Sequence, residues 1–111
     1  MNASQVAGIS RPDLIEGLPA GLTAYKRTPV FDEQSLPAGL KRSHSTKAGV
    51  WGVIHIISGE LLYRIIEPFS ERRVDAASPK VVIQPQELHE VAPLGAVRFY
   101  VEFHAIRDVS S

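Results

Sequence analysis

The chain has 111 residues, of which 44% are hydrophobic and 22% are charged. This length fits one domain with a core of its own, and the composition excludes a largely disordered chain. Twelve basic and twelve acidic residues cancel, so no net positive field favours nucleic acid or an anionic membrane. The absence of cysteine excludes disulfides and thiolate chemistry, and it limits metal ligands to His, Asp, Glu and carbonyl oxygen.

The first 17 residues show no sustained periodicity and include Pro12 and Gly17. We expect them to form an N-terminal arm with one helical turn over Pro12–Glu16, followed by a single domain over residues 18–111. The chain does not begin with basic residues and a long apolar run, so no secretory signal is predicted. No apolar stretch is long enough to span a bilayer, and we expect a cytoplasmic protein with no membrane or nucleic-acid partner.

From Leu22 onward, short runs rich in Val, Ile, Leu and aromatic residues alternate with Pro and Gly. No segment carries an apolar stripe at helical spacing over three turns. We expect Ser58-Gly59 to form the tight turn of a hairpin and residues 68–79 to form a polar loop. The expected strands cover residues 22–30, 39–43, 49–57, 60–67, 80–83, 88–92 and 96–106. This pattern predicts an all-β sandwich or small barrel.

The only nitrogen ligands for a metal are four histidines, His44, His55, His89 and His104. Glu102 stands at the centre of an apolar strand, where a carboxylate is costly to bury unless it is paired or metal-bound. Ligands from three separate strands suit a metal site with open positions. The alternative is a turn histidine, a loop histidine and a carboxylate on a half-exposed strand. Spacing alone leaves both interpretations open.

Strand alternation sorts the other candidates. Tyr100, Glu102 and His104 share one face of the last strand, and His55 lies opposite to Ile54 and Ile56, which favours an outward or interface position. His104 could support Glu102 as a fourth or neighbouring ligand. Four residues are candidates for lining a pocket: Trp51, Tyr100, His104 and Lys47. The alternative is that they serve only packing or solvation. Lys47 in particular is either a contact for an anionic ligand or a solvated turn residue.

Three stretches resemble the small YeaR/TehB-like cupin family. The first is Leu18–Phe31; the second combines His44-Ser-Thr-Lys-Ala-Gly-Val-Trp-Gly with Ser58–Leu61; the third combines Leu88–Leu94 with Val97–Phe103. The similarity covers roughly residues 18–106, and the His-x-Thr-Lys-x-Gly-x-Trp-Gly run is its most specific part. The family includes the N-terminal module of some tellurite-resistance methyltransferases as well as stand-alone proteins.

The resemblance implies a cupin-type β-barrel, also described as a double-stranded β-helix or jelly roll. It implies that His44 and His89 point into the barrel, and that Glu102 is the third ligand of a divalent metal. Zinc is the first expectation, with nickel, iron or manganese as alternatives. The sequence departs from the standard first cupin motif, because Thr46 stands where a second histidine belongs and Gly52 lies near the position of the glutamate.

These residues and the resemblance leave three functions open. The first is a metal-binding module for binding or sensing a small molecule or oxyanion, linked by the resemblance to stress or tellurite resistance. The second is a metal-dependent enzyme of oxygenase or hydrolytic type. The third is a metal-free structural or interaction barrel. The sequence shows no Gly-rich loop between a strand and a helix, so no methyl-transfer site is predicted. Bulky residues on both faces of the strands predict a homodimer.

Overall fold

The computed structural model describes residues 15–106, and every strand in it pairs antiparallel with its neighbours. The expected helical turn at Pro12–Glu16 and most of the expected N-terminal arm lie outside the described residues. The elements are β1 (Leu22–Arg27), β2 (Phe31–Asp32), the 3-10 helix η1 (Ala38–Lys41), β3 (Trp51–Ile65), β4 (Ser70–Asp75), β5 (Val81–Ile83) and β6 (His89–Ile106). The predicted all-β class is confirmed. None of the described elements is a helix long enough and apolar enough to cross a membrane.

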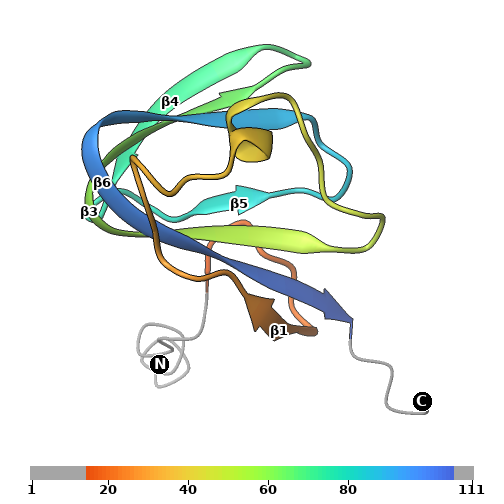
Figure 1. Ribbon diagram of the computed structural model, residues 1–111. Helices are drawn as coiled ribbons and strands as arrows, with labels where there is room; N and C mark the ends of the chain where they lie inside the picture. The colour runs from red at the N-terminus through yellow and green to blue at the C-terminus, as the bar shows by residue number, and fades with distance from the viewer. Residues whose placement is uncertain (1–14, 107–111) are drawn as a thin grey trace, which may run out of the picture.

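One curved sheet carries the whole fold. Its main pairing order is β1-β6-β3-β4, with β2 added to β6 and β5 added to β3. The long strands β3 and β6 run side by side through nearly their whole length and bend together at the left of Figure 1. Their two halves therefore belong to two layers that face each other. Within residues 15–106 no ladder joins β1 to β4, so the sheet is open.

The core lies between the two layers. Its members are apolar side chains on the inner face of the bend, and all are at most 7% exposed: Leu36, Ile54, Leu61, Tyr63, Val74, Val81, Ile83, Val91, Val97, Phe99 and Val101. Phe31 packs edge-on against Phe99 with ring centroids 5.8 Å apart, which closes the core near the bend. Burial of these side chains holds the halves of β3 and β6 against each other.

The predicted hairpin turn at Ser58-Gly59 is wrong, because both residues lie inside the continuous strand β3. The pairing of β3 with β6 shifts register between Ile56 and Ser58 and again between Gly59 and Leu61. Gly59 has φ +79°, and a Cβ there would lie 2.0 Å from the carbonyl oxygen of Ala96. Glycine therefore permits a close backbone approach at bulges that bend the strand. In the sequence, a glycine at such a bulge looks the same as a glycine in a hairpin turn.

Three smaller expectations also differ from the structure. The runs at 88–92 and 96–106 form the single strand β6, with Gly95 inside it. The expected polar loop 68–79 contains β4, whose Glu71, Arg72 and Arg73 are exposed because it lies at the end of the pairing order. Charged residues of this kind are typical of sheet edges, where they block further pairing. The strand expected at 39–43 is largely the helix η1.

Candidate functional site

A cavity of about 390 Å³ opens between the two layers. This volume lies in the range of small-molecule binding sites. Its interior is apolar and is formed by β3, β5 and β6 through Ile54, Ile83, Val91, Phe99, Val101 and Phe103. Its polar lining comes from β1 and the residue after it, from the segment before β3, and from the start of β6. The residues are Lys26, Thr28, His44, Ser45, Thr46, Lys47 and His89. An apolar interior with a few polar groups is typical of a binding site.

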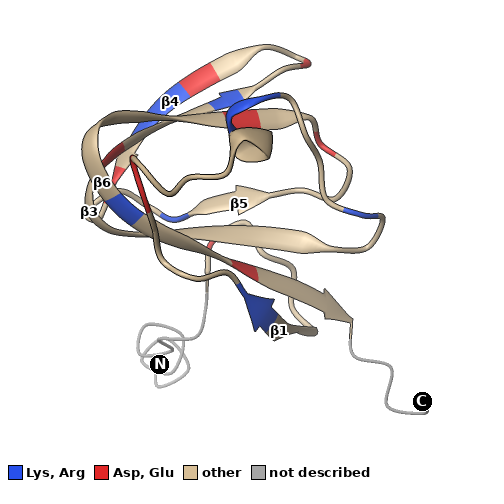
Figure 2. Ribbon diagram, viewed as in Figure 1, with Lys and Arg blue, Asp and Glu red and all other residues tan. Residues whose placement is uncertain are grey.

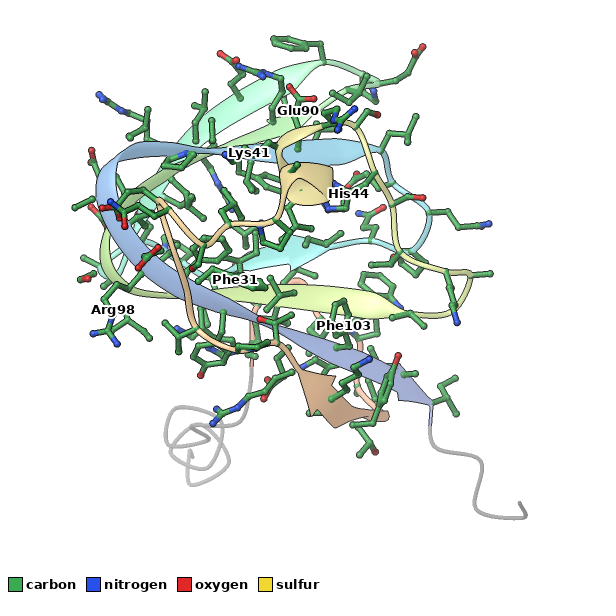
Figure 3. The ribbon with its side chains drawn as sticks, in the orientation of Figure 1. Phe31, Lys41, His44, Glu90, Arg98 and Phe103 are labelled. Atoms are coloured by element: carbon green, nitrogen blue, oxygen red, sulfur yellow. The ribbon has the colours of Figure 1, made fainter. Side chains whose placement is uncertain are left out.

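His44 and His89 lie directly opposite each other in an isolated antiparallel bridge. Each backbone N–H donates to the carbonyl oxygen of the other residue at 2.9 Å. Residues opposite one another in such a pair carry their side chains on the same face, and the two imidazole centroids are 4.0 Å apart. Figure 3 shows His44 beside η1, in the segment that runs between the layers. The structure thus brings together the two histidines that the resemblance selected.

Both imidazoles are oriented by backbone carbonyl groups two residues earlier in the chain. Nδ1 of His44 lies 2.9 Å from the carbonyl oxygen of Arg42, and Nδ1 of His89 lies 2.8 Å from that of Glu87. A carbonyl oxygen only accepts, so each ring donates from Nδ1–H, and in the neutral ring Nε2 carries the free lone pair. A histidine that ligates a metal is oriented in the same way.

His89 is the more deeply buried of the pair, with 1% of its surface exposed. Burial lowers its pKa to about 4; the hydrogen bond to the Glu87 carbonyl opposes this shift and the charge of His44 adds to it. The ring is therefore neutral near pH 7. Within residues 15–106 its Nε2 has no hydrogen-bond partner from the protein. A buried acceptor without a partner costs free energy, which a donor or cation in the cavity would recover.

The loop after His44 is fixed by Thr46. Its hydroxyl donates to the carbonyl oxygen of Val50 at 2.7 Å and accepts from the backbone N–H of Gln86 at 3.3 Å. The backbone N–H of Gln86 also contacts the Thr46 carbonyl oxygen at 3.2 Å. Thr46 therefore joins the loop before β3 to the segment that leads into β6.

Glu102 lies on the other face of β6, away from this pair. Its Oε1 accepts from Nε2 of His104 at 3.0 Å and from Nε2 of His55 at 3.3 Å. The expected ligand set of His44, His89 and Glu102 is therefore not assembled. The physical reason is strand alternation, because Val101 and Phe103 face the cavity and the residue between them faces outward. Among the described residues, no group of three His, Asp or Glu is arranged to hold a metal ion.

The outward cluster is a set of cross-strand pairs. Trp51 lies opposite His104, and His55 lies opposite Tyr100, with their rings stacked at 4.7 Å. The Arg27 guanidinium lies 4.9 Å from the Tyr100 ring centroid, a cation–π contact. Burial raises the pKa of Glu102, but the hydrogen bonds from His104 and His55 outweigh it and leave the pKa below its usual value. These contacts pack and pair the outer face.

Of the four residues expected to line a pocket, Lys47 does so, whereas Trp51, Tyr100 and His104 do not. His55 faces away from the cavity, in line with its parity, and desolvation lowers its pKa although Glu102 opposes the shift. Inspection of the sequence missed Lys26 and Thr28, which also line the cavity. Their place depends on the pairing of β1 with β6, for which the short run of residues gave no signal.

The fold and the site define a class of protein: a small, open, curved β-domain with a cavity between its layers and a histidine pair in the cavity lining. In a comparison with protein families, the family model described as the TehB-like domain matches residues 26–101. The chain belongs to the TehB-like domain family. This result confirms the TehB-like part of the resemblance found in the sequence.

Curated relatives from two strains of Haemophilus influenzae carry the name probable S-adenosyl-L-methionine-dependent methyltransferase TehB. They are 31% and 30% identical over 77 residues, which is 66% of this chain and 27% of each relative. The chain thus corresponds to about a quarter of their length. The crystal structure of TehB from Haemophilus influenzae is similar with a TM-score of 0.73 and 26% identity, over 78% of this chain and 32% of that one.

A second solved structure, of a protein from Escherichia coli, is similar over 85% of this chain and 100% of its own, with a TM-score of 0.76 and 19% identity. At that identity the likeness shows the fold alone. The match covers the whole of that protein, so the same fold makes up its entire chain.

Proposed function

We propose that this domain is a binding module that takes a small molecule or oxyanion into the cavity between its layers, where a hydroxyl or other donor group of the bound molecule would reach His44 and His89. The observation that carries the proposal is the buried Nε2 of His89, which lacks a protein partner within the described residues and belongs to a residue that lines the cavity. The link to stress or tellurite resistance, which the family resemblance implies, is part of this proposal.

A divalent metal ion, zinc first and nickel, iron or manganese as alternatives, is the second part of the proposal. The two Nε2 atoms would hold it, since both Nδ1 atoms already donate to carbonyl groups. Catalytic zinc sites use three protein ligands, and this cavity lining supplies two imidazoles and no carboxylate. The fit is therefore partial, and the expected site is weak and exchangeable, with the bound molecule and water as the other ligands.

The cupin-type barrel is the finer description of the fold that we propose. Its support is the pair of long strands that serve both layers, together with the backbone bridge between His44 and His89 that links the segment before β3 to β6 across the opening. A homodimer formed by sheet packing and a cytoplasmic location remain predictions. Sedimentation of the full chain tests the first: a monomer at all concentrations would contradict it.

The experiment that tests the proposed function is binding of N-phenyl-1-naphthylamine, sodium tellurite and zinc chloride, followed by the methyl NMR signals of Ile54 and Ile83. These methyl groups line the cavity, whereas Ile57 is exposed and serves as the internal control. We expect the organic probe, the oxyanion or both to shift the signals of Ile54 and Ile83 and to leave that of Ile57 unchanged. A folded protein whose cavity signals respond to neither would contradict the binding module.

Elemental analysis tests the metal separately. Wild type, His44→Ala, His89→Ala and the matched control His55→Ala are dialysed to equilibrium against dilute zinc chloride, and protein-bound zinc is measured as the excess over the zinc in the buffer. We expect zinc in wild type and in the control, and its loss from the two cavity variants. Equal zinc in all four proteins, or no zinc in a folded wild type, would contradict the proposed metal site. The binding module would then be judged by the NMR experiment alone.

A further inference from the structure

The charges around the cavity are of one sign. Lys26 and Lys47 line it, and no aspartate or glutamate of the described chain does, although acidic and basic residues are equally frequent in the sequence. Figure 2 shows basic segments on β1 and in the segment before β3. Lys26 and Lys47 are the only lysine or arginine residues among the described residues that line this space.

Lys26 is held at the cavity by the register of β1. The pairing of β1 with β6 shifts between Ala24 and Lys26, so Tyr25 is the extra residue and Lys26 lies opposite Phe103. Phe103 lines the cavity, and residues opposite one another share a face of the sheet. Without the bulge, the alternation along β1 would place Lys26 on the other face. The irregularity therefore directs a cation toward the opening.

Lys47 is held by the loop that Thr46 fixes. The carbonyl oxygen of Lys47 accepts from the backbone N–H of Val50 at 3.1 Å, which closes a turn directly after the Thr46 clamp. Both lysine side chains belong to exposed residues, whereas the apolar lining is deeper, with Ile54 and Val101 at 1% and 7% exposure. The cavity thus has a cationic entrance and an apolar interior.

We propose that the ligands of this cavity are small organic anions, with an apolar body between the layers and a carboxylate, sulfonate or phosphate group at Lys26 and Lys47. This inference rests on the proposed binding function and specifies its ligand class. An apolar body gains from contact with Ile54, Ile83 and Phe99, and the anionic group gains from two cations with no carboxylate among the lining residues to oppose them. An inorganic oxyanion lacks the apolar body and would therefore bind more weakly than an organic anion.

Two fluorescent probes with the same aromatic body test this inference. 8-Anilino-1-naphthalenesulfonate carries an anionic group, and N-phenyl-1-naphthylamine does not. Titrations are made in EDTA so that no metal contributes. We expect the anion to bind about tenfold more tightly to wild type, and Lys26→Met and Lys47→Met each to weaken the anion about fivefold while leaving the neutral probe unchanged. Lys41→Met is the matched control, because Lys41 is exposed and does not line the cavity.

The outcomes separate this inference from the proposed function. Equal affinity for both probes, or lysine variants that bind the anion as wild type does, would overturn the anion inference while cavity binding stands. Binding of neither probe at the Ile54 and Ile83 methyl groups of a folded protein would overturn both. Loss of anion binding in Lys41→Met to the same extent as in the cavity variants would show general surface attraction and would also overturn the inference.

Discussion

His44 and His89 donate their backbone N–H groups to each other's carbonyl oxygens at 2.9 Å, so two residues far apart in sequence form one rigid pair. The pair fixes where both imidazoles begin, and the Arg42 and Glu87 carbonyl groups fix how they are turned. A site held in this way is preorganised, because the backbone sets the position and little side-chain freedom remains to be lost on binding.

The burial of His89 predicts that the domain loses stability on mild acidification. A folded-state pKa of about 4, below the ordinary 6.5, means that the unfolded chain binds more protons between these values. The free energy of unfolding therefore falls as pH drops from about 6.5 toward 4, by up to about 3 kcal/mol from this residue. Urea unfolding of wild type and His89→Gln at several pH values from about 7 to about 5 measures the difference.

His55 also has a lowered pKa, with burial as the main cause, and adds to the same slope. His55→Gln is therefore the control, and we expect it to reduce the slope less than His89→Gln does. Glu102 acts in another window, since its lowered pKa contributes stability that is lost only as pH falls below the ordinary value of 4.5. An unchanged slope in His89→Gln would show that His89 titrates normally in the folded state.

Gly59→Ala should be among the most damaging single substitutions. The new Cβ would meet the Ala96 carbonyl oxygen at 2.0 Å, and the residue has φ +79°, so both sterics and backbone conformation oppose it. We expect a loss of about 3 kcal/mol or more, measured as the free energy of unfolding in urea. Gly39→Ala, where nothing lies within 4 Å of the added Cβ, is the control and should change little.

Leu61→Ala tests the core between the layers. Leu61 is fully buried, and truncation of such a leucine costs about 2–5 kcal/mol, because apolar contacts are lost and a void is left. Ile57→Ala, at a residue that is 43% exposed, should cost much less. A small effect of Leu61→Ala in thermal and urea unfolding would mean that the two layers pack less closely than the structure shows.

Glu102→Gln separates the outer face from the cavity. The substitution weakens two hydrogen bonds from histidines on a partly buried carboxylate, and we expect a loss of about 1–2 kcal/mol in unfolding experiments. Binding of 8-anilino-1-naphthalenesulfonate and zinc should remain as in wild type, since Glu102 does not line the cavity. Loss of zinc binding in a folded Glu102→Gln protein would instead restore Glu102 as a ligand.

The β-class could be predicted because it depends on local signals, the β-favouring runs between Pro and Gly. The family resemblance selected His44 and His89, which the structure places opposite each other. The bend at Gly59 could not be predicted, because a glycine that permits a bulge and a glycine that forms a turn look alike in a single sequence. Glu102 was assigned to the correct face with Tyr100 and His104, but which face lines the cavity depends on the opposite layer. Lys26 was missed because a bulge decides its direction.

The two strands shared by both layers also determine how ligand binding can be detected. β3 and β6 each pass through both layers, so neither layer can unfold without disrupting the two long strands that it shares with the other layer. A ligand bound between the two layers therefore stabilises the whole domain and raises its melting temperature. The increase grows with the ratio of ligand concentration to Kd. Thermal melting of the intact chain is thus a general readout for compounds, even ones that carry no fluorophore.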